Sequence, residues 1–318
     1  MPFEKLANLP VLVTGGAGFI GSHITRRLLS LGASVLVMDN FSHGSRENLA
    51  DIAGKIGIVE GDIRSLDDCL LAARGRAVVF HLAALGSVPK SVEQPRLYNE
   101  VNIAGTLNVL EAARQEGAKR VVYSASSAAY GDTPVLPKAE TMLPAPLSPY
   151  AVTKLVGEYY CQVYATVYGI STACLRYFNV FGPRQNPNSQ YAAVIPAFIS
   201  ALLKGQVPRI YGDGEQTRDF CHVDNVVKAN LLAAVCEREL VGEVMNIACG
   251  ENVSLNALLA KMQKTLGTQV KAEYLPPRAG DVRDSLADIA AAERVIGYVP
   301  EVYFDEGLER TVKAYAGK

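Results

Sequence analysis

The sequence predicts an α/β fold in which a doubly wound parallel sheet is followed by a smaller, mixed α/β lobe. Short apolar runs alternate with amphipathic helical stretches through the first half of the chain, and a glycine-rich turn joins the first apolar run to the first helix. The alternation breaks near residue 180. A chain of 318 residues exceeds the usual size of one domain, so a large domain with a second lobe fits its length.

The alternation gives the elements of the first domain in order. Strands are predicted at 11–15, 34–39, 56–62, 77–84, 120–126 and 171–182, and helices at 22–31, 67–74, 101–115 and 150–168. The strands are apolar almost throughout, as in a parallel sheet covered by helices on both faces. Residues 133–149 are rich in proline and are predicted to form a loop.

The two lobes are expected to divide near residue 180. Residues 1–180 would form the first domain and residues 181–318 mainly the second, because prolines and asparagines interrupt the pattern from Pro183 onward. Residues 223–236 and 244–249 again have the pattern of a helix and a strand of the first domain. We therefore expect the chain to re-enter that domain around 222–249.

Composition excludes several classes of protein. The 31 basic and 32 acidic residues nearly cancel, so nothing favours binding to nucleic acid or to an anionic membrane. The longest apolar stretches, such as 195–203, are less than half of the ~20 residues that cross a membrane, and no basic-then-apolar signal segment opens the chain. Six cysteines without a CxxC pair and four scattered histidines predict free thiols and no metal site. We expect a cytoplasmic protein.

The glycine-rich turn has the spacing of a dinucleotide-binding loop of the Rossmann type. Gly15, Gly18 and Gly21 stand between a strand and a helix. The first glycine permits the tight turn, the second lets the backbone approach a pyrophosphate, and the third lets helix and strand pack closely. Glycines also serve ordinary turns, so the flanking strand and helix are what make the loop informative.

An acidic residue follows at the distance that such a loop requires. Asp39 ends the next predicted strand, 18 residues after Gly21. A carboxylate there accepts hydrogen bonds from the adenosine ribose and repels a 2′-phosphate, which favours NAD over NADP. A solvated turn residue is the alternative interpretation. Asp62, after the following strand, is placed to meet the adenine amino group.

Three residues form a candidate catalytic set. Tyr150 and Lys154 lie four apart at the start of a predicted helix and therefore on one face. A nearby ammonium stabilises a phenolate, so Tyr150 could act as a general base. This spacing also occurs by chance in exposed helices, but Ser126 ends a predicted strand at the sheet edge where doubly wound folds place their chemistry.

The motifs, taken together, resemble those of the extended short-chain dehydrogenase/reductase family. They are TGGAGFIG, Asp39-Asn40, GDIR, HLAA, YSASSAAYG, SPYAVTK and RYFNVFGPR, and they extend over most of the chain. Within the family the chain is most similar to the nucleotide-sugar 4-epimerases, in particular the branch acting on UDP-N-acetylglucosamine. The resemblance implies that Tyr150 takes the proton from the sugar O4 while tightly held NAD takes the C4 hydride. The 4-keto sugar then rotates and is reduced on its other face.

The resemblance also implies which residues hold the cofactor. They are Gly15, Gly18, Phe19, Ile20, Gly21, Asp39, Asn40, Phe41, Ser42, Gly44, Asp62, Ile63, Leu82, Ala83, Ala84, Asn102, Ser124, Tyr150, Lys154, Tyr177 and Val180.

The implied substrate site draws on both lobes. Arg218 and Arg278 would hold the diphosphate with Asn179, Ala193 and Val194 would line the uridine pocket beside Tyr211, and Asp281 would meet the ribose. The sugar would be lined by Gly86, Ser87, Ser126, Ser127, Tyr150, Gln185 and Ser285. Ser285 replaces the bulky tyrosine of glucose-restricted relatives and leaves room for an N-acetyl group.

Several alternatives stay open. A UDP-glucose or UDP-hexuronate 4-epimerase shares the motifs, although Gln185 and Ser127 offer a C6 carboxylate only neutral partners and Arg184 alone is charged. A dehydratase would carry an Asp-Glu pair where Ser127-Ala128 stand. A sugar-nucleotide decarboxylase is a further alternative. A non-catalytic NAD-binding sensor of the same fold would have lost the Ser/Tyr/Lys set, and this chain keeps all three residues. The helices near 103–116 and 150–168 could pair across a two-fold axis, which predicts a homodimer with a four-helix interface.

Overall fold

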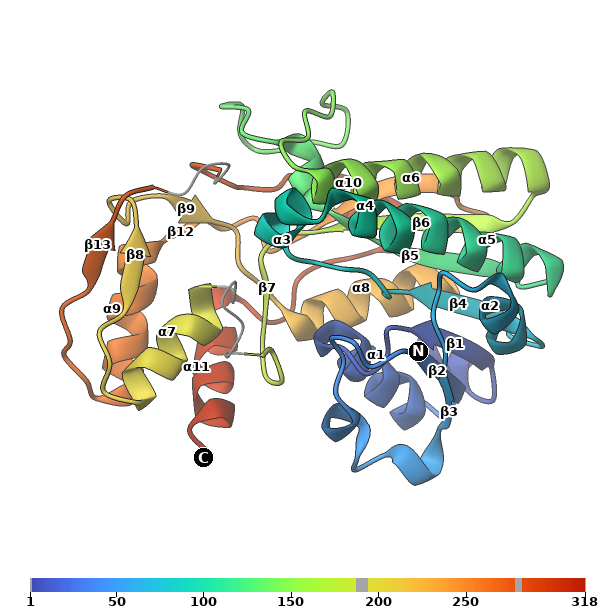
Figure 1. Cartoon of the computed structure of the whole chain (residues 1–318), viewed down its shortest axis with the longest axis horizontal. Coiled ribbons are helices and arrows are strands. Elements are labelled where there is room, and N and C mark those ends of the chain that lie inside the picture. Colours follow the sequence, from blue (N-terminus) through green and yellow to red (C-terminus); the bar gives the residue numbers. More distant parts are fainter. Residues whose placement is uncertain (1, 187–193, 278–281, 318) are drawn as a thin grey trace.

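A computed structural model describes residues 2–186, 194–277 and 282–317. Its centre is a sheet of seven parallel strands (Figure 1). Their spatial order is β11 (Val241–Ile247), β6 (Ser171–Tyr177), β5 (Arg120–Ser126), β4 (Val78–His81), β1 (Pro10–Thr14), β2 (Ser34–Asp39) and β3 (Gly57–Glu60). The winding reverses between β1 and β4. The doubly wound fold expected from the sequence is confirmed.

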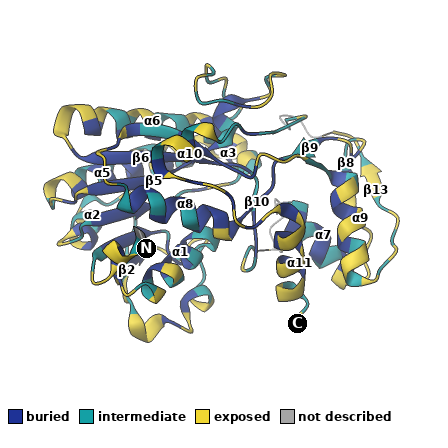
Figure 2. Ribbon diagram, turned by 180° about the vertical axis from the view of Figure 1, so that it is seen from behind, coloured by how far each residue is buried: buried dark blue, intermediate teal, exposed yellow. Residues whose placement is uncertain are grey.

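Helices cover both faces of the sheet. One face carries α1 (Phe19–Ser30), α8 (Val223–Val235) and α10 (Ala290–Ile296), and the other carries α2 (Leu66–Ala73), α5 (Gly105–Gln115) and α6 (Pro149–Tyr168). The short helices α3 (Val88–Glu93) and α4 (Pro95–Tyr98) pack beside α6. Because both faces are covered, β4, β5 and β6 are buried along their whole length (Figure 2).

A second lobe has its own apolar core. It holds α7 (Val194–Leu203), α9 (Leu255–Leu266) and α11 (Phe304–Tyr315). Its short strands pair two by two: β8 (Arg209–Tyr211) with β13 (Glu273–Leu275), β9 (Thr217–Arg218) with β12 (Val253–Ser254), and β7 (Val180–Phe181) with β10 (Cys221–His222). The chain crosses between the lobes more than once, since β11 is a strand of the large sheet and α8 and α10 pack against that sheet.

Two predicted elements are divided in the structure. The strand expected at 171–182 becomes β6 and β7, because Asn179 takes a left-handed backbone conformation with φ 30°. The helix expected at 101–115 opens with a π-helical segment, Asn99–Ala104, before α5 begins. The side chain of Asn102 in that segment bonds the backbone of Leu85 and the hydroxyl of Thr153, which are fixed by other elements.

The Asp219 carboxylate joins the second lobe to the end of the sheet. It is fully buried and accepts hydrogen bonds from the backbone N–H groups of Cys249 (3.0 Å), Gly250 (3.1 Å) and Ala287 (3.1 Å). Cys249 and Gly250 follow β11, and Ala287 stands two residues after Ser285. The carboxylate thus fixes the segment around Ser285 relative to the sheet.

No helix in the described part of the chain is long and apolar enough to cross a membrane. The six cysteines are free thiols, and all but the partly exposed Cys236 are buried. Among the described residues no three His, Cys, Asp or Glu side chains gather in a group that could hold a metal ion.

Candidate active site

Two adjoining pockets open at the carboxyl ends of the strands, where the winding reverses. The first, here the glycine-loop pocket, has a volume of about 450 Å³, and the second, the Tyr150 pocket, about 530 Å³. They are continuous, because five residues line both: Ile20, Leu82, Ala84, Gly86 and Ser124. In doubly wound folds this position is the usual ligand site.

The glycine loop is shaped so that only glycine fits at two positions. Gly15 has φ +70°, and a Cβ on it would lie 2.7 Å from the Ala83 backbone nitrogen. A Cβ on Gly21 would lie 2.2 Å from the Gly15 carbonyl oxygen. The close packing leaves the N-terminus of α1, which begins at Phe19, facing the pocket. A pyrophosphate fits such a cradle, because the helix N-terminus presents free N–H groups and partial positive charge.

Two carboxylates line the far end of the glycine-loop pocket. Asp39 is held by the backbone N–H groups of Ala17 (2.9 Å) and Phe41 (2.8 Å). Asp62 accepts from Asn40 and from Arg64, whose hydrogen bond lowers the pKa of Asp62 to about 2. Hydrogen bonds therefore fix the orientation of both carboxylates. Their negative charge disfavours a 2′-phosphate on the ribose of a bound dinucleotide.

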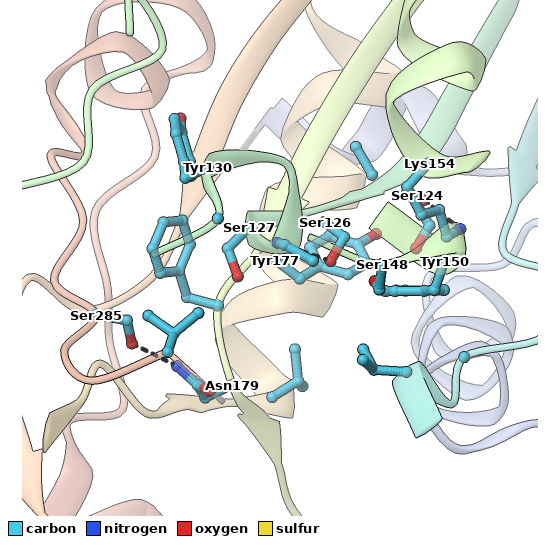
Figure 3. Close-up of a pocket in the computed structure, with 18 of the residues that line it drawn as sticks. Ser124, Ser126, Ser127, Tyr130, Ser148, Tyr150, Lys154, Tyr177, Asn179 and Ser285 are labelled. Atoms are coloured by element: carbon cyan, nitrogen blue, oxygen red, sulfur yellow. Dashed lines mark hydrogen bonds between the residues drawn. The ribbon is translucent and has the colours of Figure 1, made fainter. Parts of the chain in front are cut away.

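The candidate catalytic residues meet in the Tyr150 pocket. Tyr150 is the second residue of α6, after the N-cap Ser148 and Pro149, and Lys154 follows one turn later (Figure 3). The Lys154 ammonium donates to the carbonyl oxygen of Ser124 (2.7 Å), which ties the helix to the end of β5. Ser126, the last residue of β5, accepts from the Ala128 N–H (3.2 Å) and lines the same pocket.

Burial acts on both ionisable members of this set. It raises the pKa of Tyr150, while a hydrogen bond with Ser126 lowers it. Burial lowers the pKa of Lys154 to about 8. The Lys154 amine is therefore still mostly protonated at neutral pH. Its positive charge, one helical turn from the Tyr150 phenol, favours transient formation of the phenolate.

The opposite wall of the Tyr150 pocket comes from the second lobe. Asn179 donates from its side-chain amide to the Ser285 hydroxyl (3.0 Å) and to the Asp219 carbonyl oxygen (3.0 Å), as Figure 3 shows for the first of these bonds. These two bonds engage both amide hydrogens of Asn179. Arg218 also lines this wall, so a cation faces the pocket from the second lobe.

Most of the expected site residues do line these pockets. Of the expected cofactor residues, all but Phe41 and Asn102 line one pocket or the other. Of the expected substrate residues, the lining includes Gly86, Ser126, Ser127, Tyr150, Asn179, Arg218 and Ser285. Phe41 instead lies under the Arg46 guanidinium, and Asn102 lies behind the pocket wall with its amide bonded to Leu85.

Other expected residues are outside these linings. Ser87 caps α3, Val194 begins α7, and Tyr211 ends β8. The Gln185 amide turns back to the carbonyl oxygen of Val180 (3.2 Å). Three further expected residues, Ala193, Arg278 and Asp281, fall outside the described residues.

The structure adds residues to the pocket that sequence reasoning did not find. Ser148, Tyr130, Phe178 and Lys138 line the Tyr150 pocket. Lys138 is 2% exposed and stands in the proline-rich loop that was expected only to connect two elements. Its place is set by backbone pairing with the segment 286–288, more than a hundred residues away, so no local pattern reveals it. Ser148 could have been found from the sequence, because it is the first residue of the SPYAVTK motif.

This combination of fold and site defines a class. A doubly wound sheet, a glycine loop against α1, and a Ser/Tyr/Lys set at the carboxyl ends of the strands are the features of NAD-binding short-chain dehydrogenases/reductases. The chain belongs to the NAD dependent epimerase/dehydratase family, whose model matches residues 11–248. The expected family and the expected cofactor, NAD, are both confirmed.

Relatives with known names cover nearly the whole chain. The UDP-N-acetylglucosamine 4-epimerase of Methanobrevibacter ruminantium M1, solved with UDP-N-acetylmuramic acid, is 42% identical with a TM-score of 0.93 and covers 98% of this chain and 99% of its own. The UDP-glucose 4-epimerase of Mycolicibacterium smegmatis is 39% identical over 96% of this chain and 98% of its own length. The UDP-glucose 4-epimerase of Thermus thermophilus, solved with NAD, is 37% identical with a TM-score of 0.89, over 97% of this chain and 99% of its own.

Replacing Gly21 with alanine should empty the glycine-loop pocket of cofactor. The new Cβ must displace the Gly15 carbonyl, which we expect to cost about 1–3 kcal/mol and to distort the pyrophosphate cradle. NAD retained by the purified protein, measured after denaturation, should drop severalfold. Gly54→Ala is the matched control, because nothing lies within 4 Å of its Cβ position. Equal NAD content in both variants would contradict the assignment of the cradle.

Proposed function

We propose that this protein is an NAD-dependent isomerase that inverts C4 of UDP-hexoses and prefers UDP-N-acetylglucosamine and UDP-N-acetylgalactosamine. One observation carries the proposal. Ser126, Tyr150 and Lys154 line the Tyr150 pocket, which is continuous with the glycine-loop pocket, and the facing wall holds Arg218 and Ser285 from the second lobe. A sugar placed between these walls lies against the proton-transfer residues, with its diphosphate toward a guanidinium.

The roles of the chain's own residues follow from this arrangement. Tyr150 takes the proton from the sugar O4 at its phenolate oxygen, Lys154 stabilises that phenolate, and Ser126 shares the proton through its hydroxyl. NAD, when bound in the glycine-loop pocket, supplies a hydride acceptor and donor. Inversion then requires that the 4-keto sugar turn its other face within the Tyr150 pocket before Tyr150 returns the proton.

The reaction can be tested directly with purified protein. Incubation with UDP-N-acetylglucosamine or UDP-glucose should yield the C4 epimer of each, detected by chromatography or NMR, without added cofactor. Tyr150→Phe removes the proton acceptor and should lower turnover by roughly 10²–10⁴-fold while NAD stays bound. A 4-keto-6-deoxy sugar or carbon dioxide as the product, or an unchanged rate for Tyr150→Phe, would refute this function.

The preference for N-acetylated sugars rests on Ser285. Its hydroxyl is held between Asn179 and the Asp219 backbone N–H (3.3 Å), and it lines the Tyr150 pocket with the small residues Ser127 and Gly86. A small side chain at this position leaves space beside the sugar ring. Relatives named for glucose and for N-acetylglucosamine are equally compatible with the fold, so residue size at the pocket wall is the discriminating feature.

Filling that space should change which substrate is used. Ser285→Tyr should lower kcat/KM for UDP-N-acetylglucosamine by at least about tenfold more than for UDP-glucose, since the added ring excludes the acetyl group. Ser285→Ala keeps the space and loses only the hydroxyl, so the ratio of the two kcat/KM values should stay close to that of the unchanged protein. If kcat/KM in Ser285→Tyr fell by the same factor for both substrates, Ser285 would not determine the preference for N-acetylated sugars.

A UDP-hexuronate is the second candidate substrate, and one observation favours it. Lys138 lines the Tyr150 pocket. Among the described residues, its ammonium donates a hydrogen bond to the carbonyl oxygen of Thr133. A buried cation of this kind could meet a C6 carboxylate. Against it, burial lowers the pKa of Lys138, and the nearby carboxylates of Asp132 and Asp284, which oppose that shift, already supply negative charge to the ammonium. Including UDP-N-acetylglucosaminuronic acid in the same assay distinguishes this candidate.

We propose further that the protein forms a homodimer through the outer face of α5 and α6. On α6, Val152, Tyr159, Val163 and Val167 are about half exposed and recur on one side of the helix. The helix packs beside α5. A continuous apolar stripe on a paired helix layer suits a four-helix interface across a two-fold axis.

A charge in that stripe should separate the protomers. Val163→Glu is expected to shift the mass measured by light scattering from twice the chain mass to the single 34.1 kDa chain. The control is Leu71→Glu, which charges a similarly exposed leucine on α2, outside the stripe. This interface would be excluded if the unchanged protein had the mass of a monomer, or if the Val163→Glu variant still had the mass of a dimer.

A further inference from the structure

A buried ion pair joins α6 to β6, the two elements that follow the proline-rich loop. Arg176 on β6 donates from Nε to Glu158 Oε1 (2.8 Å) and from Nη2 to Oε2 (2.7 Å). The side chains of Arg176 and Glu158 are only 3% and 2% exposed. Removing two charges from water is costly, and fixing a helix against a strand could be achieved by apolar packing. A charged pair in this place therefore calls for an explanation.

Glu158 stands one helical turn beyond Lys154 on the buried side of α6. Tyr150, Lys154 and Glu158 follow each other at four-residue spacing, so all three share one face of the helix. Lys154 is 4% exposed, and the described partner of its ammonium is the Ser124 carbonyl, which is neutral. The ammonium is therefore desolvated, and no carboxylate of the described residues forms an ion pair with it.

Two further titratable groups face Lys154 from the sheet, and burial disfavours the charged form of each. From β4 comes His81, whose pKa burial lowers to about 3, and from β5 comes Tyr123, whose pKa burial raises and whose ring lies 5.1 Å from the ammonium. Cys161 lies two turns along α6 and is fully buried. Among these described neighbours Glu158 is the anion, and its charge favours the protonated form of Lys154.

Arg176 limits the effect of Glu158 and fixes its geometry. The bidentate contact holds the carboxylate in one orientation and compensates part of its charge. The same guanidinium lies 4.6 Å from the centre of the Tyr130 ring, which lines the Tyr150 pocket. The pair therefore contacts the pocket wall on one side and the helix of the catalytic residues on the other.

We propose that Glu158 and Arg176 are positioning residues that act in opposite directions on the charge of Lys154, and through it on the ability of Tyr150 to take the substrate proton. The inference rests on the proposed roles of Tyr150 and Lys154. Loss of the Glu158 charge removes the carboxylate that favours the Lys154 ammonium and leaves the partner guanidinium of Arg176 uncompensated. Loss of the Arg176 charge leaves Lys154 near an uncompensated carboxylate and favours the ammonium.

The test compares the alkaline limb of kcat against pH in three variants. Activity falls as pH rises through the pKa of Lys154, because the ammonium is lost. Glu158→Gln should move that limb to lower pH by about one unit, and Arg176→Met should move it to higher pH by a similar amount. The double variant E158Q/R176M removes both charges and should return the limb to within about half a unit of the unchanged protein. Glu309→Gln, in an exposed pair with Lys313 on α11, should leave it in place.

A second measurement does not depend on turnover. The ultraviolet titration of the Tyr150 phenolate, taken as the difference from Tyr150→Phe, should move to higher pH in Glu158→Gln, since a neutral Lys154 no longer stabilises it. If the unchanged protein epimerises no UDP-sugar, the proposed function fails while this titration still reports on the ion pair. If a single variant does not fold, the alkaline limb is compared between two other variants. These are Arg176→Lys, which keeps the positive charge, and the double variant E158Q/R176M. Shifts of the two single variants in the same direction, or no shift in folded variants, would overturn the proposal.

Discussion

The hydrogen bond from the Lys154 ammonium to the Ser124 carbonyl is the contact on which the rest of the site depends. It joins α6 to the end of β5, so it fixes where Tyr150 lies relative to Ser126. The contact is neutral on one side, and burial makes the cation costly. The surroundings must therefore supply compensating charge at a distance, which is the place taken by Glu158.

A second set of hydrogen bonds holds the same N-terminal end of this helix. His81 contacts the Thr106 hydroxyl (3.0 Å), Thr106 donates to the Asn102 carbonyl, the Asn102 amide donates to Thr153, and Thr153 donates to the carbonyl oxygen of Tyr150 (2.8 Å). Because Thr106 gives its hydrogen to Asn102, the His81 ring must carry its proton on Nε2. Polar groups buried in this way restrict a segment to one arrangement, which suits the proposed role of Tyr150 as a proton acceptor.

The candidate site was predictable where neighbours in sequence are also neighbours in space. Gly15, Gly21 and Asp39 belong to one strand–turn–helix–strand unit, and Tyr150 and Lys154 to one helix turn, so spacing alone places them. Gln185 was expected to reach the sugar, yet its amide is bonded to Val180, because the turn it stands on folds back on β7. Lys138 was not expected, because only its pairing with a segment near residue 287 brings it to the pocket.

By itself the sequence determined the doubly wound sheet, the glycine loop, the family and the cofactor, since each is encoded in periodicity or in motifs of fewer than about ten residues. The tertiary structure alone decided how the second lobe closes the pocket and how the interior charges compensate. The reason is physical. Asp219 bonds groups after β11 and near Ser285, and Arg176 meets Glu158 across a helix and a strand. Such contacts depend on distances between elements, which residue spacing along the chain does not contain.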